Sequence, residues 1–422
     1  MTWLQRYQIK SFVRNSVWLP PLVGMAAAML MLPPIRWLDA MLGWQAAVGP
    51  DGARAVLGAL AASLLTFIVF VFSILLVAVQ LASAQLTPRI IAAFYRNRVL
   101  KFSLAVFVFT FTFTLAALSR VEDTVPQITL WVAMYSSIAS IGVFLYMIDH
   151  ISRSLRPVIV LAAIGNVGQK VIETVYPRRV AGTQEVPAGS AQPLPERELS
   201  RTVATNRTGV ILAFDVAGLV DLARRADCMI EFVPQVGDLV ISGAALFRIY
   251  GGGAAIADRQ LEHAVAIGPE RTMEQDPEFA FRVIVDIAAK ALSPAINDPT
   301  TAVLALDQIH RLLDAVGGRR LDTGRVRDDA GKLRLAYRTP DWDDFVGLAV
   351  VEIRQFGKDS IQIVRRMRAM LEALIETVPP QRAAPLRAEL AILARGVERD
   401  FSDPEDRARA AARDSLGMGG SP

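Results

Sequence analysis

The polar residues best placed for chemistry gather in one turn of the C-terminal half, "SPAINDPTT" at residues 293–301. Asp298 stands directly before Pro299, and an acidic residue followed by proline is typical of a helix start. The unpaired amides of such a first turn, with hydroxyl groups beside them, can hold a small anion. The turn therefore predicts an anion-binding or subunit-contact site. Its candidate residues are Ser293, Asn297, Asp298, Thr300 and Thr301.

The segment before this turn predicts a helix over residues 277–292, with Asp276 as its N-terminal cap. Arg282 and Asp286 are four residues apart, so they share a helix face and can form an ion pair. Asp286 lies in an apolar run, which predicts that it is partly buried, and both residues join the candidate site. The alternative is a capped helix hairpin whose polar groups satisfy one another. It is the simpler interpretation, because capping needs no ligand.

Sequence motifs for several other chemistries are absent. The chain has no Walker A pattern, no Rossmann glycine pattern, no His-Glu-x-x-His and no Gly-x-Ser-x-Gly. The single cysteine, Cys228, excludes an internal disulfide and a cysteine-based metal site. The three histidines are far apart and lack metal-ligand spacing. We therefore expect no catalytic residue, no metal and no cofactor, and an enzyme is the least supported class.

The elements that position these residues divide between membrane and water. Four stretches contain no charged residue, namely residues 16–35, 55–86, 102–119 and 124–148. Because about 20 apolar helical residues cross a bilayer, they predict four transmembrane helices. In the first of them, consecutive prolines at residues 33 and 34 predict that the helix ends at about residue 32.

Lysine and arginine alternate between the loops as the positive-inside rule describes. The N-terminus, the second loop and the segment after the last span are basic, whereas the first and third loops carry acids beside their basic residues. This predicts cytoplasmic N- and C-termini and a cytoplasmic soluble region. A cleaved signal peptide with small residues at 26–28 is the alternative for the first span, but the charge alternation requires that span to be retained.

The second span carries a stripe of polar residues. They recur at every seventh position, which is nearly two helical turns, so they share one face. One interpretation is that they hydrogen-bond a neighbouring helix. The other is that they line a water-filled path, since an amide in lipid needs a partner or water. These candidate pore-lining residues are Thr66, Ser73, Gln80 and Thr87.

Residues 88–100, which follow the second span, predict a basic helix on the inner membrane surface. Its apolar residues fall on one face and its arginines on another, which favours contact with anionic lipid. An ordinary basic loop is the alternative. The candidate lipid-facing residues are Arg89, Arg96 and Arg98.

The fold class expected from these patterns is a membrane α-helical protein with four transmembrane helices and a C-terminal α+β cytoplasmic domain. The spacing of glycines, Asp238 and apolar residues around residues 236–246 is similar to the small β-sandwich of lipoyl and biotinyl carrier domains, but no lysine is present to carry a cofactor. The expected parts are a transmembrane domain over residues 1–175, a linker over 176–200, an α+β subdomain over 201–270, a mainly helical subdomain over 271–416, and a disordered tail over 417–422.

The chain resembles a family of predicted bacterial inner-membrane proteins classed as a domain of unknown function. The resemblance rests on the four spans, on "SAQLTPR" at the end of the second span and on "DIAAKALSPAINDPTTA" in the soluble half. It covers about residues 10–375. It implies a multi-pass protein of a bacterial inner membrane, and it supplies no activity for any residue.

Two functional classes remain. The first is a homo-oligomeric channel-like or transport protein, in which the second span lines a path and the cytoplasmic domain regulates it. The second is a membrane-anchored structural, sensing or adaptor protein without a pore. Expected partners are the lipid bilayer, including anionic lipid, and further copies of the chain, with no nucleic acid.

Overall fold

The computed structural model describes residues 2–44, 48–87, 89, 97–121, 125–180, 198–253, 255–321, 323–415 and 417, with only the backbone at 82 and 85. The chain forms two compact units. One comprises Lys10–Arg156, and the other comprises Pro157–Pro422 together with Met1–Ile9. Each unit has its own packed interior.

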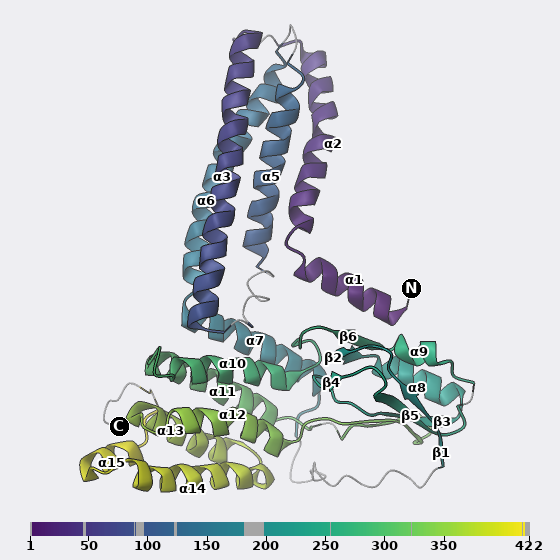
Figure 1. Ribbon diagram of the computed structural model, residues 1–422, viewed down its shortest axis with the longest axis vertical. Coiled ribbons are helices and arrows are strands. Elements are labelled where there is room, and N and C mark those ends of the chain that lie inside the picture. The colour runs from purple at the N-terminus through teal and green to yellow at the C-terminus, as the bar shows by residue number, and fades with distance from the viewer. Residues whose placement is uncertain are drawn as a thin grey trace. The chain divides into compact units, whose positions relative to one another are not determined.

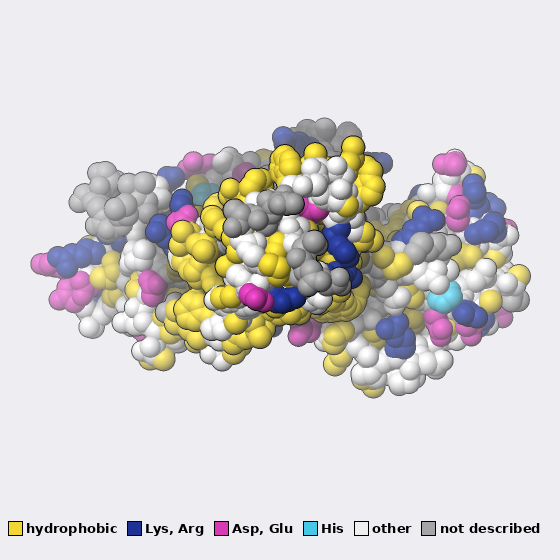
Figure 2. Space-filling view, turned by 90° about the horizontal axis from the view of Figure 1, so that it is seen from above, with side chains coloured by type: hydrophobic (Ala, Val, Ile, Leu, Met, Phe, Trp, Pro, Cys, Tyr) yellow, Lys and Arg dark blue, Asp and Glu magenta, His cyan; other side chains and the backbone are white. Residues whose placement is uncertain are grey.

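The first unit is an all-helical bundle (Figure 1). The short helix α1 (Trp3–Asn15), whose residues up to Ile9 belong to the other unit, precedes four long helices: α2 (Leu19–Leu42), α3 (Pro50–Gln85), α5 (Arg98–Leu118) and α6 (Gln127–Ser154). α5 packs against the other three long helices and is the central one. Seen end-on, the flanks of this bundle are covered mostly by hydrophobic side chains (Figure 2).

The helix α2 continues through Pro33 and Pro34 to Leu42, so the prediction that it ends at about residue 32 was wrong. Tertiary contacts hold both flanks of the proline pair. Leu32 is buried in a cluster with residues of α5 and α6, and Asp39 beyond the prolines is buried too. A proline removes one helical hydrogen bond, and neighbouring helices compensate for it in a membrane protein.

Five described helices are long and apolar enough to cross a membrane: α2, α3, α5, α6 and α7 (Pro157–Val175). The first four correspond to the predicted spans. α7 belongs to the second unit, where it packs on α10 (Pro277–Ala291) and α11 (Pro299–Gly317). A Cβ atom on Gly168 of α7 would meet Ala280 Cβ at 2.7 Å, so the glycine permits this close approach. The division of the chain therefore falls before α7, at residue 156.

The second unit contains two sheets (Figure 1). The larger has the order β1-β5-β3-β8-β7, antiparallel except for the parallel pair of β3 and β8, and the smaller has the order β4-β2-β6. Both sheets, together with α8 (Val216–Arg225) and α9 (Asp258–Glu262), contribute to one hydrophobic core. The strands are β1 Leu199–Ala204, β2 Gly209–Phe214, β3 Cys228–Phe232, β4 Leu239–Val240, β5 Ala245–Gly251, β6 Val265–Gly268, β7 Arg325–Arg327 and β8 Leu333–Tyr337.

The larger sheet joins distant parts of the sequence. Its β7–β8 hairpin lies within the segment predicted as mainly helical, yet β8 pairs with β3 far earlier in the chain. The remaining helices pack on one another, with α11 against α10 and α13, and α13 against α14 and α15. They are α12 Trp342–Phe356, α13 Ile361–Thr377, α14 Ala383–Asp400 and α15 Pro404–Ala411.

Candidate functional site

Three of the four polar stripe residues lie on the exposed face of α3. Thr66, Ser73 and Gln80 are all exposed in the single chain. The Thr66 hydroxyl donates to the Ala62 carbonyl oxygen at 3.1 Å, and the Ser73 hydroxyl donates to that of Val69 at 3.0 Å. The Gln80 amide has no hydrogen-bond partner among the residues that the structure describes. Within the described chain, the stripe therefore does not bond to another helix.

Thr87 does not lie on the same helix face as the other three stripe residues. α3 ends at Gln85, and Thr87 lies in the non-helical segment that follows, only 5% exposed. Its hydroxyl oxygen accepts a hydrogen bond from the Arg89 backbone N–H at 3.4 Å. A seven-residue spacing keeps residues on one face only while the helix continues. The seven-residue spacing alone grouped Thr87 with the stripe, although the predicted span already ended at residue 86.

Polar contacts between spans come instead from α5 and α6. Thr110 and Ser140 are fully buried, and their hydroxyl oxygens are 2.9 Å apart. Ser103 and Thr114 are buried on the same helix as Thr110. Small hydroxyl residues let two helices approach closely and hydrogen-bond in an apolar surrounding. The interhelical hydrogen bonding considered for the stripe is thus found at the α5–α6 contact.

Asp39 has a role that its position near a loop did not suggest. It is 8% exposed in the last turns of α2, and its carboxylate lies at the N-terminus of α6. It accepts hydrogen bonds from the Ile128 N–H at 2.6 Å and from the Thr129 N–H at 3.0 Å, and a third from the Thr129 hydroxyl at 2.6 Å. Asp39 therefore caps α6, although the Ile128 amide that it accepts from is 89 residues later in the chain.

The structure describes two of the three candidate lipid-facing arginines. Arg96, with residues 88, 90–95 of the predicted interfacial helix, lies outside the described residues. Arg89 and Arg98 are described, and both are exposed. Arg98 is the first residue of α5, whose N-terminus is capped by Asn97 through its side-chain oxygen. The lipid contact of these arginines stays a prediction.

The "SPAINDPTT" turn forms a closely capped helix hairpin between α10 and α11. One oxygen of Asp298 accepts from the Thr301 N–H at 3.0 Å, and the other accepts from the Thr301 hydroxyl at 2.5 Å. Asn297 adopts a φ of 49°, and the Ser293 hydroxyl donates to the Lys290 carbonyl oxygen at 2.7 Å. Thr300 is exposed. Because Asp298 already occupies the Thr301 amide, this geometry agrees with the capped-hairpin interpretation; the anion or subunit contact stays a prediction.

Arg282 and Asp286 form the expected ion pair, with Nε and Oδ1 2.7 Å apart. The structure adds a second acid that the sequence spacing could not reveal. Glu352 of α12 accepts from both terminal nitrogens of Arg282, at 2.5 and 2.7 Å. The hydrogen bond from Arg282 lowers the pKa of Glu352 below its usual value. Arg282 therefore ties α10 to α12, and its side chain is 28% exposed.

A second cluster lies at the start of α10. Asp276 caps the helix by accepting from the Phe279 N–H at 3.0 Å, and it pairs with Arg271. Glu278, 18% exposed, accepts a hydrogen bond from Gln235 at 3.2 Å and lies 3.5 Å from Arg271. Burial and the neighbouring Asp276 charge raise the pKa of Glu278 to about 7. The sequence identified Asp276 as a cap, but only the tertiary structure brings these groups together.

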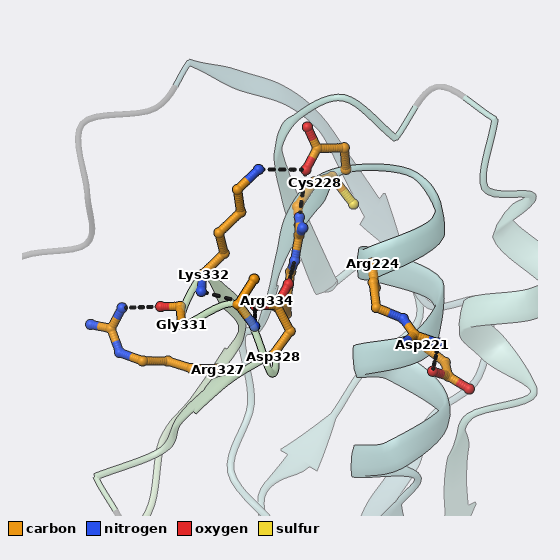
Figure 3. A network of polar contacts seen from close by, with 10 residues as sticks. Asp221, Arg224, Cys228, Arg327, Asp328, Gly331, Lys332 and Arg334 are labelled. Carbon is orange, nitrogen blue, oxygen red and sulfur yellow. Dashed lines mark hydrogen bonds and ion pairs between the residues drawn. The ribbon is translucent and has the colours of Figure 1, made fainter.

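Arg334 of β8 is the centre of a third network (Figure 3). Its Nε donates to Asp328 at 2.6 Å, and one of its terminal nitrogens donates to Asp227 at 2.8 Å. Only 4% of Arg334 is exposed. Its hydrogen bonds lower the pKa values of both aspartates. This network fastens the β7–β8 hairpin to the turn before β3, which makes it a structural feature of the sheet.

Comparisons with known proteins agree with the membrane architecture. A family model described as "Predicted membrane protein (DUF2254)" matches residues 14–373. An uncharacterised protein of Mycobacterium bovis is 28% identical over 433 aligned residues, which cover 97% of this chain and 82% of the relative. An uncharacterised protein of Mycobacterium tuberculosis has the same identity and coverage. No solved structure was found to match the chain.

Proposed function

Since this chain belongs to the family described as predicted membrane protein (DUF2254), we propose that it assembles from several copies around a path lined by α3. The observation that supports this most is the orientation of Gln80. Its amide lies on an exposed helix face in an apolar span and has no partner within the described chain. A primary amide surrounded by lipid is costly. A shared axis, with water or the same face of another copy, would satisfy it.

A second candidate is a membrane-anchored sensing or adaptor protein without a pore. The hydroxyls of Thr66 and Ser73 favour it, because each is satisfied by a carbonyl of its own helix and needs no water. In that case the exposed face of α3 contacts lipid or packs against another protein. Neither proposed role includes catalysis, a metal or a cofactor.

Cysteine accessibility separates these roles. In a Cys228→Ala background, chosen because Cys228 is buried among apolar residues, Ser73→Cys and Gln80→Cys should react with a charged membrane-impermeant thiol reagent. Phe72→Cys is the matched control. It is also exposed, at the same depth as Ser73 but rotated by about 100° around the helix. Inert cysteines at 73 and 80, or equal labelling at 72, would exclude the path and favour the adaptor.

The proposed orientation, for a bacterial inner membrane, places both termini on the cytoplasmic side. It follows from the loop charges. Reporter fusions after residues 45, 95, 122 and 420 test it, with periplasmic activity expected at 45 and 122 and cytoplasmic activity at 95 and 420. A periplasmic signal at residue 420 would contradict both the orientation and a cytoplasmic regulatory domain.

A further inference from the structure

The outer surface of the bundle contains a groove between the start of α5 and the second half of α6. Its cavity volume is about 500 Å³, within the range of pockets that bind small ligands. Val99 and Phe102 of α5 form one wall, and Val143 and Tyr146 of α6 form the other. The lining is apolar apart from Arg98 at one end and the Tyr146 hydroxyl. The groove thus pairs a long hydrophobic surface with a single positive charge.

A glycine leaves this groove open. A Cβ atom added to Gly142 would meet no atom within 4 Å, so nothing in the described chain fills the space above it. Phe102 and Tyr146, which flank the groove, are 63% and 58% exposed. From Ala139 to Tyr146 the lining of α6 rises by about 10 Å, almost two helical turns. An extended hydrocarbon chain matches this narrow apolar shape.

The Arg98 charge at the end of the groove is available to bind a ligand. Arg98 is exposed and has no ion pair or hydrogen bond with any residue that the structure describes. Two other basic groups of the bundle are engaged: Lys101 donates to the Arg14 carbonyl oxygen at 2.6 Å, and Arg153 of α6 pairs with Asp149. Arg98 also begins a membrane-spanning helix, the level at which lipid phosphates are found.

A helix from another copy is a poorer occupant than a lipid. The exposed apolar face of α3 contains no charged residue from 55 to 85 and could not neutralise Arg98. We propose that the groove binds an anionic phospholipid, with one acyl chain along Phe102, Gly142 and Tyr146 and the phosphate on Arg98. This site is independent of any path along α3.

Lipid binding to the purified full-length protein tests the proposal. Native mass spectrometry in detergent would compare added dioleoylphosphatidylglycerol with dioleoylphosphatidylcholine. We expect the anionic lipid to bind about fivefold more tightly, the contribution of one basic residue near an anionic headgroup. Gly142→Leu should reduce binding of both lipids by filling the groove. Arg98→Gln should retain acyl-chain binding but remove the preference for the anionic headgroup.

Two matched variants control for changes elsewhere. Gly58→Leu adds the same side chain at an equally open glycine on α3, and Arg120→Gln removes an exposed charge two residues beyond the other end of α5. Both should bind lipid as the unmodified protein does. Equal affinity for the two lipids in the unmodified protein overturns the proposal, as does a Gly142→Leu protein that binds normally. Because the two test variants alter different parts of the groove, its apolar wall and its charged end, either one decides the matter if the other does not fold.

Discussion

Replacing Glu278 by glutamine should remove a pH dependence from the stability of α10. Glu278 is 18% exposed, accepts a hydrogen bond from Gln235 and lies beside the buried cap Asp276. Burial and the charge of Asp276 raise its pKa from 4.5 to about 7. Glutamine preserves the size of the side chain and cannot ionise, so the substitution isolates the cost of the charge.

The direction of the pH dependence follows from the direction of the Glu278 pKa shift. Below pH 4.5 the carboxyl is protonated in both the folded and the unfolded chain, and its stabilising contribution is fully present. As the pH rises through about 7 the folded protein loses that contribution, because the unfolded chain releases the proton more easily. A difference of about 2.5 pH units, at about 1.4 kcal/mol per unit, amounts to about 3 kcal/mol.

Hydrogen exchange of the α10 amides in the full chain, between pH 5 and 8 and corrected for intrinsic rates, measures this local stability. Protection in the unmodified protein should fall by up to about a hundredfold across that range. It should stay nearly constant in Glu278→Gln. The exposed Glu270 provides the control, and Glu270→Gln should follow the unmodified protein. A flat profile in the unmodified protein, or the same slope in Glu278→Gln, would refute the role given to Glu278.

Three further substitutions test capping and ion pairing. Asp39→Ala should lower the free energy of unfolding of the bundle by about 1–3 kcal/mol, since it unpairs donors at Thr129, and thermal unfolding in detergent measures the loss. Asp298→Ala should destabilise the second unit by about 1 kcal/mol in urea unfolding, the usual value for a lost N-cap, and a phosphate-dependent shift would support the anion site. Asp286→Ala should lower the free energy of unfolding by about 1–2 kcal/mol, because Arg282 remains paired with Glu352. This is less than the loss expected when a fully buried ion pair is broken, and a loss above about 3 kcal/mol would contradict it.

Local features of this chain were predictable because their causes are local. The absence of charge marked the four long spans of the bundle, since lipid excludes charge whatever the neighbours are. Asp276 and Asp298 cap the helices that they were expected to cap or begin, because a cap bonds to amides two or three residues ahead. The same range of interaction made the Arg282–Asp286 pair predictable.

Contacts between distant segments decided the rest. Packing against α5 and α6 keeps α2 helical beyond its prolines, and Asp39 caps a helix that begins 88 residues later. β8 joins β3 from across the sequence, and Glu352 supplies the second acid for Arg282. The sequence by itself determined four of the five described helices that are apolar enough to cross a membrane, and the starts of α10 and α11. Which face of each helix is buried, and which polar groups find partners, depend on surfaces that only the folded chain brings together.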